Sequence, residues 1–556
     1  MNRDSAFFKS SSKIAARFLQ TAVIIDDRAF VKEIEPDYTQ PLIAPPSLAT
    51  SKLSEDPPSP TPTTPPVSIL AAPNPHGLDA HAVIDGYARK GIVCSVLCRQ
   101  PEDVLGNPLS RLSQLAEVAD ILVIDWNIHL NNQESSEETL ELLEKAIQKN
   151  IDETPRQLRL IVVYTGELDL NSVADKIRNR LTSKFGDIEA DGDFAFIRGA
   201  VRIVVLAKKT IMGRSTDAKK QETDFGDLAD RTIAEFTEMT AGIVSNFALD
   251  SMARLRKATH SVLNRFNPSL DSAFLLHRCL IAPPQEADEH LAPIIAAELQ
   301  AIIEDGAQPL SPQIIAEWFE QRPDTHATYG FSTPAEERQF LVKLCDAGHK
   351  QALAGTVPSQ IDRFKNLVPK ATLNELINLI AGSETEDSNE NLAMLMAVKA
   401  RYSSELPYLT LGTIVAQAKD TQTIYWLCLQ PSCDCIRLDG VRGFPMLRLS
   451  QSMDRFGLVI KHDDKFVHLR VDPRPFKVRT VEFKPDSAKK CVLSERRPDG
   501  SYWFKSKDPN YTCRWIADLK FEQAHRAVQA LSSQNSRVGL TESEWQRRWD
   551  LANFDV

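Results

Sequence analysis

Side chains able to transfer a phosphoryl group follow several apolar runs of this sequence. Asp26 and Asp27 follow the first such run, Asp125 follows another, and Thr165 and Lys208 close two more. Phosphoryl transfer needs a nucleophile, a metal ion that screens the phosphoryl oxygens and a cationic group that holds them. Three carboxylates in one cleft require a neutralising cation, and their hard oxygen atoms suit Mg²⁺. The sequence therefore predicts a magnesium-dependent phosphoryl-transfer site, provided that the fold brings these residues together.

An alternation of apolar runs and amphipathic segments would position these residues. Strands are expected at residues 21–25, 92–97, 120–124, 158–164 and 200–207. Helices are expected near residues 78–90, 108–118, 136–149 and 171–184. Short, continuous apolar strands that alternate with helices specify a parallel sheet covered on both faces. We predict a flavodoxin-like α/β fold with a five-stranded parallel sheet, in which ligands bind at the carboxyl ends of the strands.

A proline-rich segment interrupts this alternation after the first strand. Residues 36–75 contain twelve of the 33 prolines, mixed with Ser, Thr and Ala. Such a composition cannot bury a core and favours extended, solvated chain. Because the segment separates the first strand from the helix that should follow it, we predict a disordered insertion within a single domain.

Four motifs of this region, TAVIIDD, ADILVIDWN, IVVYTG and IVVLAKK, resemble the receiver domains of bacterial two-component response regulators. The resemblance covers about residues 15–215. It implies that Asp125 accepts a phosphoryl group from a partner histidine kinase, and that Asp26 and Asp27 form the acid pair, at least one of which coordinates Mg²⁺. We expect no enzyme activity beyond Mg²⁺-dependent phosphorylation and dephosphorylation of the receiver itself.

The same resemblance implies roles for three further residues. Asn127 would lend its backbone carbonyl to the metal, Thr165 would hydrogen-bond a phosphoryl oxygen, and Lys208 would form an ion pair with the phosphoryl group. Two positions depart from the family pattern. Leu206 stands where receivers usually carry an aromatic side chain that acts as a switch. Lys209 stands where proline usually follows the lysine, which leaves it as a rival for the role of Lys208.

The remainder of the chain changes character twice. Apolar residues three or four apart predict helices to about residue 400, beginning with a long amphipathic helix or helix pair over 225–266. From residue 406, alternating β-branched and aromatic residues predict strands, with a Pro-Asp-Gly turn at 498–500 between two of them. We predict a receiver domain at 1–215, a helical domain at 216–400, a β-rich domain at 401–520 and C-terminal helices at 521–556.

The run YWLCLQPSCDCIRL and the following FPMLRL resemble the long receiver-containing proteins of bacterial phage-defence two-component systems (Detocs-like), over most of the chain. In those systems a kinase passes phosphate either to an effector with a receiver and a toxic catalytic domain, or to a receiver protein that acts as a phosphate sink. No motif of a catalytic module is recognised in the later segments. We therefore expect a phosphate buffer or partner switch that competes with a receiver-bearing effector, and we leave open whether it is a homodimer.

A basic, aromatic segment offers a second function. Between Arg455 and Arg514, fifteen Lys or Arg residues stand against eight Asp or Glu residues. Aromatic residues are interleaved with them: Phe466, Phe476, Tyr502, Trp503 and Trp515. Such a surface could bind single-stranded nucleic acid, which would make the protein a receiver-controlled nucleic-acid-binding regulator. Half-exposed strands show the same alternation, however, so nucleic acid is not the expected partner.

A phosphohydrolase of the haloacid-dehalogenase type is a third reading. Those enzymes also use an Asp nucleophile and Mg²⁺ on an α/β sheet. They place the nucleophile and its Asp partner two residues apart at the end of the first strand, whereas Asp26 and Asp27 are adjacent here. The order of motifs therefore argues against this class.

Cysteine and histidine residues offer two weaker signals. Cys428, Cys433 and Cys435 could bind zinc with a further cysteine, but their spacing is unusual for zinc sites, and reduced, buried thiols are the default expectation. His260 lies on a predicted helix, as a phosphorelay histidine would. No phosphotransfer motif surrounds it, so we expect a packing or surface residue.

Composition places the protein in a broad class. A net charge of −10, 42% hydrophobic and 25% charged residues are typical of a globular chain with an acidic surface. No uninterrupted apolar stretch of about eighteen residues occurs, and the first residues lack the pattern of a secretory signal. We expect a cytoplasmic protein with no membrane partner.

Overall fold

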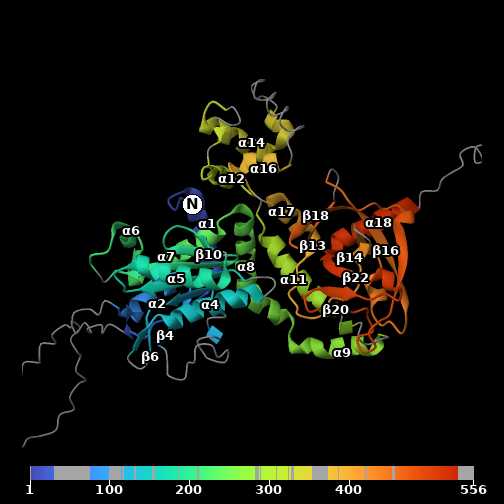
Figure 1. The fold of residues 1–556 in the computed structure, drawn as a ribbon, viewed down its shortest axis with the longest axis horizontal. Coiled ribbons are helices and arrows are strands. Elements are labelled where there is room, and N and C mark those ends of the chain that lie inside the picture. Colours follow the sequence, from blue (N-terminus) through green and yellow to red (C-terminus); the bar gives the residue numbers. More distant parts are fainter. Residues whose placement is uncertain are drawn as a thin grey trace, which may run out of the picture. The chain divides into compact units, whose positions relative to one another are not determined.

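A computed structural model describes most of the chain, and its elements are drawn in Figure 1. The described residues are 2–30, 76–98, 114–115, 118–130, 133–152, 157–186, 188–209, 212–281, 287–288, 290–308, 310–323, 325–326, 331–353, 373–385, 387–419, 422–453 and 457–535. The proline-rich insertion, most of the helix expected at 108–118 and residues 536–556 lie outside them. The chain forms two compact units, Met1–Arg322 with Arg338–Gly348 and Pro323–Glu337 with His349–Val556.

A mixed, mostly parallel sheet forms the centre of the first unit. The five predicted strands are present: β1 (Thr21–Ile25), β4 (Val93–Leu97), β5 (Ile121–Ile124), β8 (Arg159–Thr165) and β11 (Val201–Lys208). They pair in parallel in the order β4-β1-β5-β8-β11. Three short strands extend the sheet: β9 (Glu189–Ala190), β10 (Ala195–Arg198) and β12 (Glu222–Thr223). The expected five-stranded parallel sheet is therefore only part of an eight-stranded mixed one, in which β9 and β10 run antiparallel beyond β11.

Helices cover both faces of this sheet. Side chains of each strand alternate between the two faces, so that Val23 and Ile25 pack on one side and Ala22 and Ile24 on the other. The first side is covered by α4 (Glu137–Asp152) and α5 (Leu170–Phe185). The second is covered by α1 (Ala6–Phe18), α2 (Ala80–Ala88) and α7 (Leu228–Thr240). The sequence analysis missed α1, which precedes the first strand.

Further helices and two small sheets complete the first unit. The helices are α6 (Thr216–Lys219), α8 (Ile243–Arg265), α9 (Asp271–Leu280), α11 (Leu291–Gly306) and α12 (Pro312–Phe319), while α14 (Pro334–Leu353) is shared with the second unit. The two-stranded sheets pair β2 (Ala29–Phe30) with β3 (Leu78–Asp79) and β6 (Ile128–Leu130) with β7 (Gln133–Ser135). The expected helix pair over 225–266 is confirmed by α7 and α8. Within the described residues no helix is long and apolar enough to cross a membrane.

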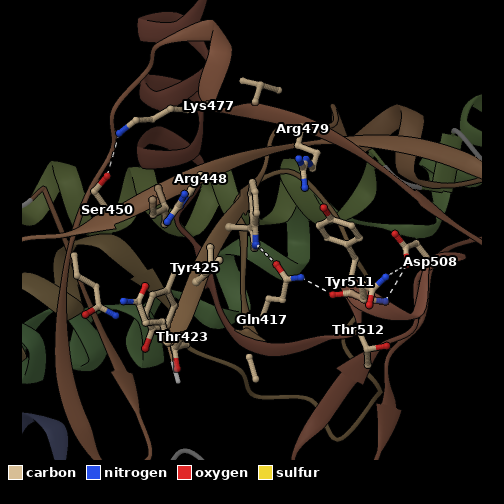
Figure 2. Close-up of a pocket in the computed structure, with 18 of the residues that line it drawn as sticks. Gln417, Thr423, Tyr425, Arg448, Ser450, Lys477, Arg479, Asp508, Tyr511 and Thr512 are labelled. Atoms are coloured by element: carbon tan, nitrogen blue, oxygen red, sulfur yellow. Dashed lines mark hydrogen bonds between the residues drawn. The ribbon is translucent and has the colours of Figure 1, made fainter. Parts of the chain in front are cut away.

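An antiparallel ten-stranded sheet dominates the second unit. Its strands are β13 (Val398–Lys399), β14 (Thr413–Lys419), β15 (Gln422–Cys428), β16 (Arg442–Gln451), β17 (Leu458–His462), β18 (Lys465–Arg470), β19 (Val478–Phe483), β20 (Glu495–Arg496), β21 (Tyr502–Phe504) and β22 (Cys513–Leu519). Its helices are α16 (Leu373–Ala381), α17 (Ser388–Ala397) and α18 (Phe521–Asn535). The expected turn at 498–500 joins β20 to β21, and Gly500 has the positive φ of 80° that such a turn favours. A broad hollow lies over part of this sheet (Figure 2).

The cysteines are free thiols in varied surroundings. The expectation of buried thiols is confirmed for Cys428, Cys435, Cys491 and Cys513. It is wrong for Cys98, Cys279, Cys345 and Cys433, which are exposed. His260 is exposed on α8.

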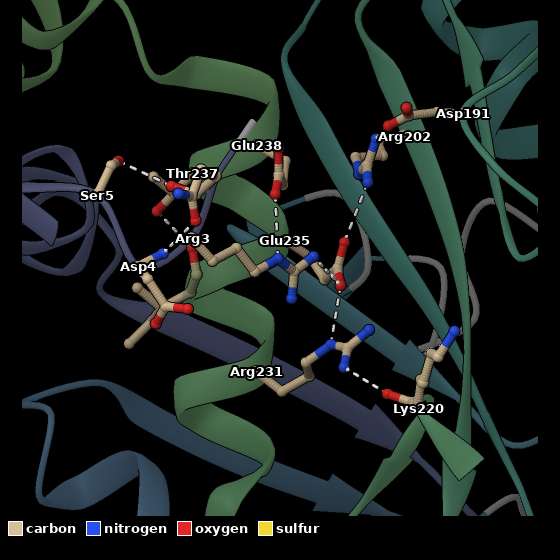
Figure 3. A network of polar contacts seen from close by, with 12 residues as sticks. Arg3, Asp4, Ser5, Asp191, Arg202, Lys220, Arg231, Glu235, Thr237 and Glu238 are labelled. Atoms are coloured by element: carbon tan, nitrogen blue, oxygen red, sulfur yellow. Dashed lines mark hydrogen bonds and ion pairs between the residues drawn. The ribbon is translucent and has the colours of Figure 1, made fainter. Parts of the chain in front are cut away.

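Three arginines surround a buried glutamate in the first unit (Figure 3). Glu235 of α7 forms ion pairs with Arg3 at 2.7 Å, with Arg231 at 2.8 Å and with Arg202 of β11 at 3.1 Å. Burial alone would raise the pKa of Glu235, but the arginines outweigh it and hold that pKa below its ordinary value. The network therefore ties the N-terminal segment and α7 to the centre of the sheet.

Candidate phosphoryl-transfer site

The predicted site residues lie at one edge of the first sheet. Neighbouring parallel strands place their carboxyl ends at the same edge, and β1, β5, β8 and β11 are neighbours. Backbone hydrogen bonds continue just past the strand ends, because the amide of Asp125 donates to Ile25 O at 2.9 Å and that of Asp26 donates to Leu97 O at 3.1 Å. The strands therefore position the residues that follow them.

Lys208 bridges the two carboxylates. Its Nζ lies 2.7 Å from Asp26 Oδ2 and 3.0 Å from Asp125 Oδ1, and it also donates to the backbone oxygen of His76 at 2.7 Å. Lys208 is 0% exposed, Asp26 1% and Asp125 5%. Lys209 is exposed. The geometry therefore favours Lys208 over its neighbour as the cation of this site.

The site carries more negative charge than Lys208 alone offsets. Burial raises the pKa of Asp125, Lys208 opposes this rise, and the charges of Asp26 and Asp27 add to it, with a raised pKa as the result. Burial would lower the pKa of Lys208, but Asp125 and Asp26 outweigh it and raise that pKa above its ordinary value. The Lys208 ammonium is therefore held in its charged form. The positive charge of Lys208 does not fully offset the combined negative charge of Asp125 and its acidic neighbours.

Thr165 and Asn127 are linked through Glu167, which the sequence analysis did not single out. Thr165 is buried, and its Oγ1 accepts a hydrogen bond from the amide of Glu167 at 3.1 Å. Asn127 Nδ2 donates to Glu167 Oε1 at 2.6 Å. The hydroxyl proton of Thr165 remains able to donate, because an amide donor uses only an oxygen lone pair.

Arg214 holds two of the strand ends together, and no motif pointed to it. Its buried guanidinium donates to Lys208 O at 2.6 Å and to Glu167 O at 3.0 and 3.1 Å. It also forms an ion pair with Glu222 at 3.2 Å. Arg214 therefore fixes the backbone that carries Lys208 to the loop that follows Thr165.

An aromatic side chain lies one strand away from the position where receivers usually carry one. Leu206 is fully buried, and its partner across the strand pair is Tyr164. The Tyr164 ring centroid lies 5.9 Å from Lys208 Nζ, and its hydroxyl donates to Thr223 O at 2.8 Å. An aromatic group thus contacts the site lysine from β8 instead of β11.

The donor chemistry of the site fits a Mg²⁺ ion. Asp125 Oδ1 is buried and accepts no hydrogen bond from the described residues, apart from its ion pair with Lys208. In the same part of the chain, no three His, Cys, Asp or Glu side chains are gathered as a metal cluster. Mg²⁺ does not need such a cage, because one or two carboxylates, waters and substrate phosphates normally bind it. The carboxylates of Asp26, Asp27 and Asp125 and the backbone carbonyl of Asn127, the expected ligands, are oxygen donors of the kind that Mg²⁺ takes.

Comparison with known families agrees with this geometry. Residues 18–211 match the family model described as the response receiver domain. The match covers Asp26, Asp27, Asp125, Asn127, Thr165 and Lys208, but not Arg214, and it supports the predicted receiver domain for this segment. Among curated proteins, none matches the chain.

Proposed function

We propose that Asp125 accepts a phosphoryl group from a phosphohistidine of a partner histidine kinase. The observation that carries this proposal is the buried Asp125 carboxylate, 3.0 Å from an ammonium that is itself fully buried. In the transfer, an oxygen of Asp125 attacks phosphorus, the P–N bond to the histidine breaks, and its electron pair returns to the imidazole. The product is an acyl phosphate on Asp125.

The other site residues would stabilise the transferred group. Lys208 would offset the charge that moves onto Asp125, and the hydroxyl of Thr165 would donate to a phosphoryl oxygen. Asp26, Asp27, Asp125 and the carbonyl of Asn127 would hold Mg²⁺, which screens the phosphoryl oxygens. Arg214 would act as a positioning residue, since it donates to the backbone oxygens of Lys208 and Glu167 beside the site.

Hydrogen bonding favours Asp125 over Asp26 as the nucleophile. Both carboxylate oxygens of Asp26 are engaged, Oδ1 by the amide of Arg28 at 2.9 Å and Oδ2 by Lys208. A phosphohydrolase of the haloacid-dehalogenase type would use the acid of the first strand, so this arrangement speaks against that class.

For the cellular role, we propose a phosphate buffer or partner switch in anti-phage signalling. The support for this role is that Leu206 is not aromatic, so this receiver would not signal through a rotating aromatic group at this position. A buffer competes for phosphate with a receiver-bearing effector. Adding this protein to kinase and effector should lower effector phosphorylation, and the Asp125→Asn variant should lose that effect.

Phosphorylation of the full chain tests the primary proposal. The protein is incubated with its kinase, ATP and Mg²⁺, or with acetyl phosphate as a small donor, and the hydroxylamine-labile label is located by mass spectrometry. We expect label on Asp125, none in Asp125→Asn, and normal labelling in Asp175→Asn, which removes an exposed carboxylate from α5. Label that persists in Asp125→Asn would overturn the assignment.

A further inference from the structure

A large hollow in the second unit is lined by none of the phosphoryl-transfer residues. Its volume is about 1900 Å³, and residues of β14, β15, β16 and β19 and of the segments around β21 form its wall. Pockets for small molecules usually measure about 300–1,000 Å³. The hollow is therefore large enough for an extended ligand of several repeating units.

Cationic side chains dominate the charge of this hollow. Four basic residues, Arg448, Lys477, Arg479 and Arg497, line it against one acidic residue, Asp508. This excess stands out because the whole chain carries a net charge of −10.

Three of these four basic residues have no ion pair within the part of the chain that the structure describes. Within the described part of the chain, no carboxylate forms an ion pair with Arg448, Arg479 or Arg497. Lys477, by contrast, lies 2.6 Å from Asp472. Arg448 and Arg479 come from paired strands, and Figure 2 shows both on the wall of the hollow. Two guanidinium groups on one wall, neither paired with a carboxylate among the described residues, suit the phosphates of a polyanion.

Aromatic rings accompany these guanidinium groups. Arg479 lies 5.3 Å from the Tyr511 ring centroid and Arg497 lies 3.8 Å from that of Trp503. Phe476 also lines the hollow and is 74% exposed. Unstacked bases stack on exposed rings such as Phe476. An arginine packed against a ring enlarges the planar surface that a base can contact.

Two consecutive hydrogen bonds fix side chains that form the wall of the hollow. Trp426 Nε1 donates to Gln417 Oε1 at 2.9 Å, and Gln417 Nε2 donates to the backbone oxygen of Asn510 (Figure 2). Asp508, the one acidic wall residue, accepts from Asn510 at 3.0 Å and 2.9 Å. These hydrogen bonds preorganise the wall, and the single carboxylate of the wall accepts its hydrogen bonds from the neighbouring Asn510.

From the arginines without a carboxylate partner among the described residues, the aromatic rings beside them and the size of the hollow, we propose that the second unit binds single-stranded nucleic acid there. Phosphates would contact Arg448 and Arg479, and bases would stack on Phe476 and on the rings beside Arg479 and Arg497. The sequence analysis interpreted the basic residues as belonging to solvent-exposed faces of strands, because the sequence alone does not show that they line one hollow. The observations that carry this proposal involve none of the phosphoryl-transfer residues.

Fluorescence anisotropy with the full chain tests the proposal. The probes are labelled single-stranded RNA and DNA of about 12 nucleotides, the matching duplexes, and AMP and inorganic phosphate as competitors. We expect single strands to bind at low salt and to dissociate as salt rises. We also expect AMP and phosphate to compete only at concentrations far above that of the oligonucleotide. No binding of any single strand, equal affinity for duplexes, or equal competition by AMP would each overturn the proposal.

Matched variants locate the site. The double variant Arg448→Ala/Arg479→Ala should weaken binding at least tenfold and reduce the slope of log K against log salt by about 1.4, or about 0.7 for each lost phosphate contact. Phe476→Ala should weaken binding by about five- to 100-fold. The control Arg442→Ala/Lys484→Ala removes equal charge at exposed positions farther along β16 and just beyond β19, outside the hollow. Equal losses in the control, or none in the double variant with unchanged thermal unfolding, would refute this location.

Discussion

Lys208 is bonded more closely to Asp26 than to any other carboxylate, with 2.7 Å between Nζ and Oδ2 and neither side chain more than 2% exposed. Removing one partner of a buried ion pair leaves an uncompensated charge, which typically costs about 3–5 kcal/mol. Lys208→Met should therefore lower the free energy of unfolding of the first unit by about that amount. Urea titration measures this loss of unfolding free energy, and hydrogen exchange of the β1 and β5 amides reports it for the first unit.

Lys209→Met is the matched control for that experiment. Its side chain is exposed, so its effect should stay within about 0.5 kcal/mol. If the two variants lose equal stability, the assignment of the buried cation to Lys208 fails.

Mg²⁺ should stabilise the folded chain, because it offsets the charge that Lys208 leaves uncompensated. At about ten times its dissociation constant, a ligand of the folded state adds about 1.4 kcal/mol. Differential scanning calorimetry should show a higher Tm with MgCl₂ than with NaCl of equal ionic strength, and EDTA should reverse the shift. The double variant Asp26→Asn/Asp125→Asn should lose most of the shift; a shift of unchanged size in that variant would mean that Mg²⁺ binds elsewhere.

Glu235→Gln should destabilise the first unit in a pH-dependent way. Three arginines lower the pKa of Glu235 in the folded state, whereas in the unfolded chain it is about 4.3. The ionised glutamate therefore contributes fully above about pH 4.3, and its contribution is lost as pH falls through the folded pKa. We expect a loss of about 3–5 kcal/mol at neutral pH that shrinks in acid.

Urea titrations of wild type and Glu235→Gln at several pH values measure this difference. Glu238→Gln serves as the control, since it removes a carboxylate that pairs with Arg3 at 3.0 Å and leaves Glu235 in place. A difference between wild type and Glu235→Gln that stays constant from neutral to acid pH would contradict the network.

Arg214→Met should impair labelling of Asp125 without removing any group that would touch the phosphoryl group. Two backbone oxygens lose their donor, which costs at least about 2 kcal/mol, and the strand ends that carry Thr165 and Lys208 lose a common anchor. We expect labelling by acetyl phosphate to slow about tenfold or more. Arg89→Met, at an exposed position on the same unit, should label at the wild-type rate; equal rates for Arg214→Met would remove its positioning role.

The sequence was most informative where chemistry and local pattern coincide. Apolar runs ending in Asp26, Asp125, Thr165 and Lys208 predicted both the central strands and the edge at which these residues meet, because a parallel sheet aligns its strand ends. The short antiparallel strands β9 and β10 carry no long apolar run and were missed.

Contacts between distant segments could not be predicted in the same way. Arg214 donates to the backbone oxygens of Lys208 and Glu167, and Arg202 of β11 pairs with Glu235 of α7, so neither interaction leaves a local motif. The hollow of the second unit depends on the register of β15, β16 and β19, which brings side chains from separate strands onto one wall.

The hydrogen bond from Lys208 to the backbone oxygen of His76 connects the site to the segment just before β3. His76 stands where the chain returns after residues 31–75, next to the pairing of Ala29 with Leu78. An ammonium that turned toward a phosphoryl group on Asp125 would share or give up this bond. Hydrogen exchange of the amides in the pairing of β2 with β3 would then report the phosphorylation state.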